Sequence, residues 1–194
     1  MEIVIATNNK DKLIEYKNIL KEFNIKCISL KKLNIVCDPQ ETGTTFKENS
    51  LIKAQEIAKF TDKMIIADDS GIEVDELKGE LGVYSHRFMG ENTSYPEKCM
   101  EIIRRIEGKN RTARFVCCIT LLNYKGQINQ FEGVIEGSIG YELKGNNGFG
   151  YDPIFIPNGY SITTAEMSDK QKHSISHRGN AARLLVDFLK KEGV

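Results

Sequence analysis

The longest apolar stretch of the chain, residues 112–122, most constrains what the protein can fold into. Its apolar side chains fall on both faces of a predicted strand: Ala113, Phe115, Cys117, Ile119 and Leu121 on one face, and Val116, Cys118 and Leu122 on the other. A strand that is apolar on both faces is covered twice, as at the centre of a sheet packed between helices. The turn at residues 123–126 then predicts a hairpin with a second strand over residues 127–139.

Apolar spacing and helix-start signals predict the remaining elements. Short apolar runs indicate strands over residues 3–6, 26–29, 64–67 and 153–157, and helical spacing indicates helices over residues 13–20, 46–60 and from about residue 178. Two capping boxes, Thr45 with Glu48 and Ser94 with Glu97, mark helix starts. The helix after Ser94 is expected to bury Met100, Ile103 and Ile106. These elements together predict an α/β fold.

The composition is that of an ordinary soluble protein. Of the 194 residues, 40% are hydrophobic and 28% are charged, which suits one domain or two lobes sharing a sheet. The 27 basic and 27 acidic residues balance, so neither nucleic acid nor a membrane is expected as a partner. No signal peptide or membrane span is visible. The five cysteines include no C-x-x-C pair, and we interpret them as reduced thiols of a cytoplasmic protein. The three histidines lack zinc-ligand spacing.

Two adjacent carboxylates, Asp68 and Asp69, follow the predicted strand at residues 64–67. Ser70 and Gly71 come next, and the glycine predicts a turn because it tolerates unusual backbone angles. Ligand sites in α/β sheets gather at the carboxyl ends of strands, and carboxylate oxygens suit Mg²⁺. Taken alone, the stretch is about equally well interpreted as a plain turn.

The first predicted strand leads through a polar turn, Thr7-Asn8-Asn9, into a helix. A helix N-terminus attracts phosphate through its backbone N–H groups and its dipole, and Lys10 and Lys12 add positive charge. The glycine pattern of a P-loop is absent from the sequence. The alternative is an ordinary capped helix with solvated lysines.

Glycines flank an aromatic ring in Gly148-Phe149-Gly150, and Tyr151 and Asp152 follow. With little local cover, the Phe149 ring is expected to face a cavity, where it would stack on a purine whose N–H edge binds a neighbouring carboxylate. The alternative is that Phe149 packs in the core. A second polar cluster, residues 172–178, precedes the last predicted helix, and its Lys, His and Arg side chains suit polyphosphate or a carbonyl oxygen.

Five motifs in order resemble those of the inosine/xanthosine triphosphate pyrophosphatases, the Ham1-like family that acts on noncanonical purine nucleotides. They are Ala6-Thr7-Asn8-Asn9-x-x-Lys12-x-x-Glu15, Glu41-Thr42-Gly43-x-x-Phe46-x-x-Asn49, Ala67-Asp68-Asp69-Ser70-Gly71, Gly148-Phe149-Gly150-Tyr151-Asp152-Pro153 and Ser176-His177-Arg178-Gly179. The resemblance covers essentially the whole chain. One departure is Asn8, where the family usually has glycine. Because Asn tolerates a left-handed backbone, the turn is expected to survive.

The resemblance implies a fold and an activity. The fold would be a long mixed sheet with helices forming two lobes around an active-site cleft, in a single domain over residues 1–194 and a homodimer. The activity would be Mg²⁺-dependent hydrolysis of ITP, dITP and XTP to the monophosphate and pyrophosphate, which removes these nucleotides from the pool.

The resemblance also implies roles for individual residues. Phosphate binding would fall to Thr7, Asn8, Asn9, Lys10, Asp11 and Lys12, and metal binding to Glu41 and Asp69. Asp69, with Asp68 beside it, would be the base that activates water, and Lys53 and Lys172 would contact the triphosphate. Phe149 would stack on the base, and the rest of the substrate site would be Ser70, Gly150, Tyr151, Asp152, Ser176, His177 and Arg178. Because Arg178 only donates hydrogen bonds, it would match the C6 carbonyl of hypoxanthine or xanthine and leave adenine unpaired.

Two other functions stay open at the level of sequence. One is a purine-nucleotide sensor that has lost catalysis, and the intact set of Glu41, Asp68 and Asp69 counts against it. The other is a Maf-like pyrophosphatase acting on pyrimidine nucleotides, which Phe149 and the Ser176-His177-Arg178 motif disfavour.

Overall fold

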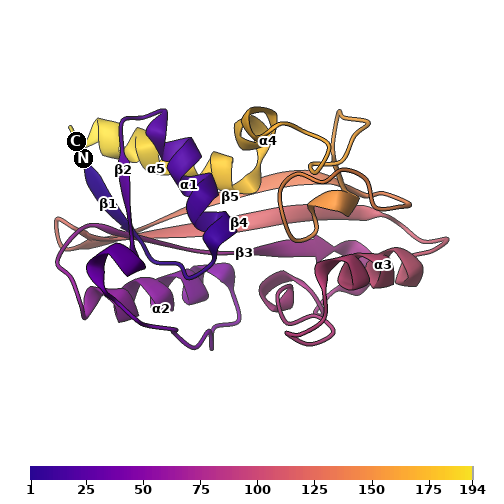
Figure 1. The fold of residues 1–194 in the computed structure, drawn as a ribbon, viewed down its shortest axis with the longest axis horizontal. Coiled ribbons are helices and arrows are strands. Elements are labelled where there is room, and N and C mark those ends of the chain that lie inside the picture. Colours follow the sequence, from indigo (N-terminus) through magenta and orange to yellow (C-terminus); the bar gives the residue numbers. More distant parts are fainter. Residues whose placement is uncertain (194) are drawn as a thin grey trace. The chain divides into compact units, whose positions relative to one another are not determined.

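The computed structural model describes residues 1–193, which form a mixed α/β fold (Figure 1). Its strands make a six-stranded sheet in the order β2-β1-β3-β4-β5-β6. They are β1 (Glu2–Ile5), β2 (Lys26–Ser29), β3 (Ile65–Val74), β4 (Thr112–Tyr124), β5 (Gln127–Ile139) and β6 (Phe155–Pro157). β1 pairs in parallel with β2 and β3, whereas β5 and β6 are antiparallel. The predicted fold class, an α/β protein with a long mixed sheet, is confirmed.

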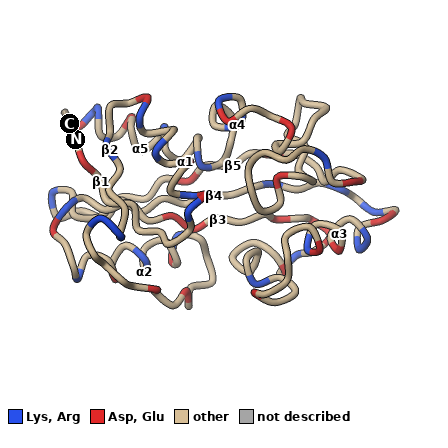
Figure 2. The backbone as a smooth tube through the Cα atoms, viewed as in Figure 1, with Lys and Arg blue, Asp and Glu red and all other residues tan. Residues whose placement is uncertain are grey.

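Within the described residues, five α-helices accompany this sheet: α1 (Lys10–Lys21), α2 (Phe46–Ala58), α3 (Tyr95–Arg105), α4 (Asp169–Ile175) and α5 (His177–Lys191). The predicted capping boxes open α2 and α3, each with both reciprocal hydrogen bonds present. Across residues 1–193, no helix combines the length and the apolar character needed to cross a bilayer. Basic and acidic residues are interspersed along the chain (Figure 2).

The chain divides into two compact units. Unit 1 comprises Met1–Asp69, Cys117–Gly133 and the segment from Arg178 onward, and unit 2 comprises Ser70–Val116 and Val134–His177. β3, β4 and β5 each contribute residues to both units. The same strands therefore support two separate cores.

The strands of unit 1 are covered on both faces. In β1, Ile3 and Ile5 pack in one cluster with side chains of α1 and α5, whereas Val4 packs in another with Ala54 and Ile57 of α2. Alternate residues of a strand point to opposite faces of the sheet. In unit 1, α1 and α5 therefore cover one face and α2 covers the other, as Figure 1 shows.

In unit 2, α3 packs one face against the strands. Cys99, Ile102 and Ile106 are fully buried and belong to the same cluster as Ile72 of β3. They recur at the i, i+3, i+7 spacing of an amphipathic helix. Met100 is 56% exposed, so the expectation that it faces inward is wrong.

β3 runs through the acidic pair as one continuous strand, so the turn predicted after residue 67 is wrong. Gly71 is needed there because there is no room for a side chain, and not because of its backbone freedom. A Cβ at Gly71 would lie 2.2 Å from the Gly82 carbonyl oxygen and 2.6 Å from Ser85 Oγ. The loop that follows β3 packs directly against the strand backbone, and a side chain does not fit between them.

Candidate active site

β3 carries Asp68 and Asp69 past the end of its parallel neighbour. β1 ends at Ile5, which pairs with Ile66, so both acids lie beyond the paired region. This is where parallel strands place ligand sites. Because successive side chains on a strand alternate between faces, the two carboxylates have different neighbours.

Asp68 lies among positive side chains and is 3% exposed. Its Oδ2 lies 3.0 Å from Lys12 Nζ and accepts a hydrogen bond from Arg178 Nη2 at 3.2 Å. Arg178 also donates through Nη1 to Glu15 Oε2 of α1. Among residues 1–193, Asp68 Oδ1 is buried and has no hydrogen-bond partner. Asp68 is thus held through one oxygen.

Asp69 belongs to a second cluster, on the side of α2. Lys53 Nζ donates to Asp69 Oδ1 at 3.0 Å and to Glu41 Oε1 at 2.9 Å. Asp69 Oδ2 accepts from Asn49 Nδ2 at 3.1 Å. The fold therefore brings Glu41 and Asp69, the predicted metal ligands, together around one cation.

The two neighbouring aspartates have opposite pKa shifts. Burial alone would raise the pKa of Asp68, but the charges of Lys12, Arg178 and Lys53 outweigh it and hold that pKa well below its usual range. Burial is also the largest influence on Asp69, and it raises the pKa of Asp69 although Lys53 and Lys12 act in the other direction. Asp68 therefore stays ionised, and Asp69 is the better proton acceptor of the two.

Lys53 stays protonated between its carboxylates. Burial acts to lower the pKa of Lys53, but the negative charges of Asp69, Asp68 and Glu41 prevail and raise it. The ammonium is therefore a fixed positive charge at neutral pH.

The turn from β1 into α1 is built by Asn9. Asn9 is the N-cap of α1, and its Oδ1 accepts from the backbone N–H groups of Asp11 at 2.9 Å and Lys12 at 3.1 Å. Thr7 Oγ1 accepts from the Asn9 N–H at 3.2 Å, and Lys10 is exposed. This capping agrees with both interpretations of the sequence, a phosphate-binding helix N-terminus and an ordinary capped helix. The first turn of α1 also places Lys12 beside Asp68.

Asn8 does not use the left-handed backbone that was expected of it. It is absent from the described residues with positive φ, and its Nδ2 donates to the Cys37 carbonyl at 2.9 Å. A residue outside the positive-φ region has no need to be glycine, so the departure from the family pattern costs no backbone strain. The Asn8 side chain instead ties the turn to the loop around residue 37.

In unit 2, Asp152 organises the glycine-rich loop. Its Oδ2 accepts from the Phe149 backbone N–H at 2.8 Å and from Lys172 Nζ at 2.6 Å, and its Oδ1 accepts from Thr164 Oγ1 at 2.8 Å. A Cβ on Gly148 would lie 2.1 Å from Asp152 Oδ2. Both oxygens of Asp152 thus accept hydrogen bonds inside the protein, whereas the sequence predicted that this carboxylate accepts from a purine.

Phe149 and Tyr151 flank Gly150 but differ in their surroundings. Phe149 is partly exposed, and Lys172 Nζ lies 5.2 Å from the centre of its ring. Tyr151 is buried, and its hydroxyl donates to the Ser85 carbonyl at 2.6 Å. The Gly150 φ of 65° allows the chain to turn between the two rings. The loop is therefore anchored by Tyr151, whereas Phe149 is only partly buried.

The predicted polar cluster at residues 172–178 spans α4 and the start of α5. Ser176 is the C-cap of α4 and is buried. His177 begins α5, and its ring stacks on Phe115 with centroids 4.8 Å apart. Arg178, 1% exposed, belongs to unit 1, where it contacts Asp68. Ser70 follows Asp69 directly in β3.

Three features of the site were not predicted. Glu15 and Asn49 stood in motifs without a role, yet both are buried. Glu15 accepts from Arg178, which also contacts Asp68, and Asn49 donates to Asp69. A polar residue directly before Tyr16, on the buried side of α1, is the signal that identifies Glu15. α4 was missed, although Ser168 and Gln171 form a capping box that marks its start.

Glu41 and Asp69 fit a divalent cation. Both offer carboxylate oxygens, and both already lie within 3.0 Å of a single cation, the Lys53 ammonium. Among the described residues, no three His, Cys, Asp or Glu side chains form a complete metal-binding group. Mg²⁺ commonly takes only one or two carboxylates, with water and substrate phosphates supplying the remaining ligands. The donor set therefore suits Mg²⁺.

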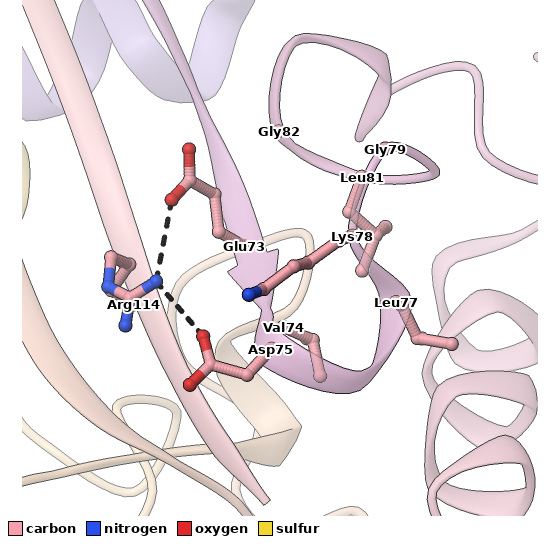
Figure 3. Close-up of a pocket in the computed structure, with 9 residues that line it drawn as sticks. All are labelled: Glu73, Val74, Asp75, Leu77, Lys78, Gly79, Leu81, Gly82 and Arg114. Atoms are coloured by element: carbon pink, nitrogen blue, oxygen red, sulfur yellow. Dashed lines mark hydrogen bonds and ion pairs between the residues drawn. The ribbon is translucent and has the colours of Figure 1, made fainter.

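A separate cavity of about 300 Å³ lies in unit 2, next to the end of β3 (Figure 3). Arg114 borders it, with Nη1 3.6 Å from Glu73 and 3.1 Å from Asp75, so the charge of Arg114 is compensated. None of the predicted site residues lines this cavity. It is therefore distinct from the candidate active site.

The fold and the site together define a class of protein. Unit 1 presents two buried aspartates, with lysines beside them, beyond a parallel strand pair, and unit 2 presents an aromatic side chain on a glycine-rich loop. Such groups at the carboxyl ends of parallel strands are typical of α/β proteins that bind small ligands. Residues 3–188 match the family described as the Ham1 family, and the chain belongs to this family.

Several relatives are similar over nearly their full length. The dITP/XTP pyrophosphatase of Clostridium perfringens (strain 13 / Type A) is 42% identical over 198 residues, which cover 97% of each chain. The protein of the same name from Staphylococcus aureus (strain N315) is 41% identical, covering 98% of this chain and 97% of its own. Two solved structures agree with the fold at a TM-score of 0.87. The Staphylococcus aureus Ham1 protein is 41% identical and covers 99% of this chain and 100% of its own. The Coxiella burnetii HAM1 protein is 38% identical, with 98% and 99% covered.

Proposed function

We infer that the protein hydrolyses noncanonical purine nucleoside triphosphates, namely ITP, dITP and XTP, to the monophosphate and pyrophosphate. Full-length relatives at 41–42% identity are named dITP/XTP pyrophosphatase. The observation that carries the inference to this chain is the convergence of Glu41 and Asp69 on one cation beside Asp68. Removal of such nucleotides from the pool is the corresponding role.

Mg²⁺ is the proposed cofactor, held by Glu41 and Asp69. When bound, it would neutralise charge on the phosphate oxygens, which is the main requirement of phosphoryl transfer. Support comes from the two hard carboxylates that already share a cation in the protein. Lys53 would remain beside them as a second, fixed positive charge.

Asp69 is the proposed base. Its raised pKa and its polar neighbours suit it to take a proton from water as the water oxygen bonds to phosphorus and pyrophosphate leaves. Asp68 stays ionised and keeps Lys12 in position. Lys12 and Lys53 would then attract the phosphate oxygens, beside the turn of Thr7, Asn8 and Asn9 and the first helical residues Lys10 and Asp11.

Phe149 is the proposed stacking platform for the purine. Phe149 is partly exposed on a loop that Asp152 holds by accepting hydrogen bonds from the Phe149 N–H and from Lys172. Ser176 and His177, with the backbone at Gly150 and Tyr151, are the proposed donors and acceptors around the base. A site that hydrogen-bonds a substrate group can reject a mismatched one by roughly 10⁴–10⁵-fold.

Arg178 receives a different role from the one the resemblance implies. Both of its terminal nitrogens donate to carboxylates of unit 1, Glu15 and Asp68. We therefore propose that Arg178 fixes Asp68 rather than reading the C6 carbonyl of the base. Asp152 and Lys172 likewise serve chiefly to shape the loop that carries Phe149.

Three wider features are also proposed: action as a single domain over residues 1–194, a homodimeric state, and a cytoplasmic location. Support for the location is that all five cysteines are free thiols. Light scattering coupled to gel filtration should give twice the 21.9 kDa mass of one chain. A mass of one chain at micromolar concentration would contradict the homodimer.

Product analysis tests the activity. Purified protein is incubated with Mg²⁺ and, separately, ITP, dITP, XTP, ATP, GTP, dTTP and UTP, and the products are resolved by anion exchange. The monophosphate and pyrophosphate should form from the first three at least about 100-fold faster than from ATP. Orthophosphate with a diphosphate, a preference for dTTP or UTP, or binding without turnover would each contradict the proposal.

A further inference from the structure

Asn49 is fully buried in the first turn of α2, and both ends of its side-chain amide are used. Its Oδ1 accepts from the Gly43 backbone N–H at 2.8 Å, and its Nδ2 donates to Asp69 Oδ2 at 3.1 Å. A buried polar side chain is costly unless it is hydrogen-bonded, so these two bonds account for the presence of the amide.

The two bonds connect the segments that carry the proposed metal ligands. Gly43 lies two residues after Glu41, and Asp69 is the second ligand. Asn49 and Lys53 are four residues apart on α2 and therefore lie on the same side of the helix. α2 thus offers an amide to one oxygen of Asp69 and an ammonium to the other, at 3.1 and 3.0 Å. The orientation of the Asp69 carboxylate is fixed from one helix.

Gly43 gives independent support, because the loop approaches Asn49 more closely than any side chain would allow. A Cβ at Gly43 would lie 2.7 Å from Asn49 Oδ1 and 2.6 Å from Glu48 Cβ. Gly43 therefore lets the loop bearing Glu41 dock directly on the amide. The loop would have to move away from α2 if this position carried a methyl group.

An amide is the side chain that suits these two partners. Ionised Asp69 can only accept, and the Gly43 N–H can only donate, so the residue between them must present a donor at one end and an acceptor at the other. An aspartate at position 49 would lose the donor, and a leucine would lose both groups. The amide is also neutral, so it orients Asp69 without offsetting the negative charge that attracts a cation.

We propose that Asn49 is a positioning residue for the metal site, holding the carboxylates of Asp69 and Glu41 in the arrangement that binds a divalent cation. The proposal rests on the proposed function, because it presumes that these two carboxylates are the ligands. Outer partners of metal ligands typically contribute 10–100-fold to affinity.

The test is direct titration of nucleotide-free protein with Mn²⁺ as a paramagnetic probe, followed by water-proton relaxation. Asn49→Leu should weaken Mn²⁺ binding by about 10–100-fold. The matched control is Ser50→Ala, which removes another fully buried polar group from the same helix, one bonded to Thr120 rather than to a carboxylate. Ser50→Ala should bind Mn²⁺ within about twofold of the wild type, and thermal unfolding shows whether the two variants are comparably folded.

Gly43→Ala disturbs the contact between Gly43 and Asn49 by changing the loop instead of the helix. It serves as the second variant if Asn49→Leu does not fold. It should also weaken Mn²⁺ binding by about tenfold or more. Wild-type affinity in a folded Asn49→Leu or Gly43→Ala, or equal losses in Ser50→Ala, would overturn the positioning role alone. Wild-type protein whose Mn²⁺ binding is absent, or unaffected by Glu41→Gln, would overturn the metal site itself.

Discussion

Asp68 and Asp69 are adjacent in the chain, yet strand geometry gives them opposite electrostatic surroundings. Asp68 faces Lys12 and Arg178, which hold its pKa down, whereas burial dominates at Asp69 and raises its pKa. When the pKa values of two neighbouring acids shift in opposite directions, one acid stays charged and the other is suited to take up a proton. At the scale of single residues, the proposed division of labour between the two acids therefore follows from the alternation of side chains along β3.

The buried pair of Glu15 and Arg178 should contribute strongly to stability. Their side chains are 9% and 1% exposed, and removing one partner of such a pair leaves an uncompensated buried charge. Glu15→Leu is predicted to lower the free energy of unfolding by about 3–5 kcal/mol in urea denaturation. Glu101→Gln, which breaks the exposed pair with Arg104, is the control and should change stability little. Equal effects of the two substitutions would contradict the assignment.

Substitution of Phe149 should weaken the binding of dITP more than it slows turnover. Stacking of a base on an aromatic ring is worth about 1–3 kcal/mol, so Phe149→Ala is predicted to raise KM for dITP roughly 5- to 150-fold. The value of kcat should fall much less, because Phe149 is proposed to contact the base and not the phosphate that reacts. Steady-state kinetics, with the exposed Phe60→Ala as control, measure both constants. An unchanged KM would show that Phe149 does not contact the base.

At the scale of elements, glycines decide where strands and loops approach each other. A methyl group at Gly71 would lie 2.2 Å from the backbone oxygen of Gly82, whereas one at Gly140 would meet nothing closer than a side-chain carbon at 3.4 Å. Gly71→Ala is therefore predicted to destabilise the protein by about 1–3 kcal/mol or more, and Gly140→Ala by much less. Chemical denaturation of both variants checks the difference. Similar losses would mean that the loop after β3 can move away without cost.

Local signals predicted most elements, and the exceptions have physical causes. The capping boxes at Thr45 and Ser94 mark the starts of α2 and α3 because both hydrogen bonds lie within one helical turn. The continuity of β3 through two aspartates could not be predicted, because strand propensity disfavours Asp and the side chains that bind these carboxylates come from distant parts of the chain. The inward face of α3 was predicted from Met100, Ile103 and Ile106. Ile106 is buried and Ile103 packs against the core cluster, but Met100 is exposed, because apolar spacing alone does not say which apolar side chains face the core.

At the scale of the whole molecule, the proposed site residues divide between the two units. Unit 1 holds the carboxylates with Lys12, Lys53 and Arg178, and unit 2 holds the loop with Phe149. Ordered motifs identified nearly all of these residues, but not their partners. The contact of Arg178 with Asp68 joins positions 110 residues apart, so only the folded chain shows that this arginine faces a carboxylate. The resemblance to the family predicted the fold as a whole. Contacts between distant residues, such as that of Arg178 with Asp68, are known only from the structure.

The central claim is that the buried carboxylate cluster of unit 1 is the catalytic apparatus and that Asp69 takes the proton from water. Turnover of dITP by Asp69→Asn at saturating Mg²⁺ tests it most directly, with Asp187→Asn, an exposed acid of α5, as control. The asparagine keeps the size of the side chain but cannot take up a proton at neutral pH, so kcat should fall by at least about 10²–10⁴-fold, while Asp187→Asn retains wild-type turnover. An Asp69→Asn protein that turns over dITP within tenfold of the wild type would contradict the account.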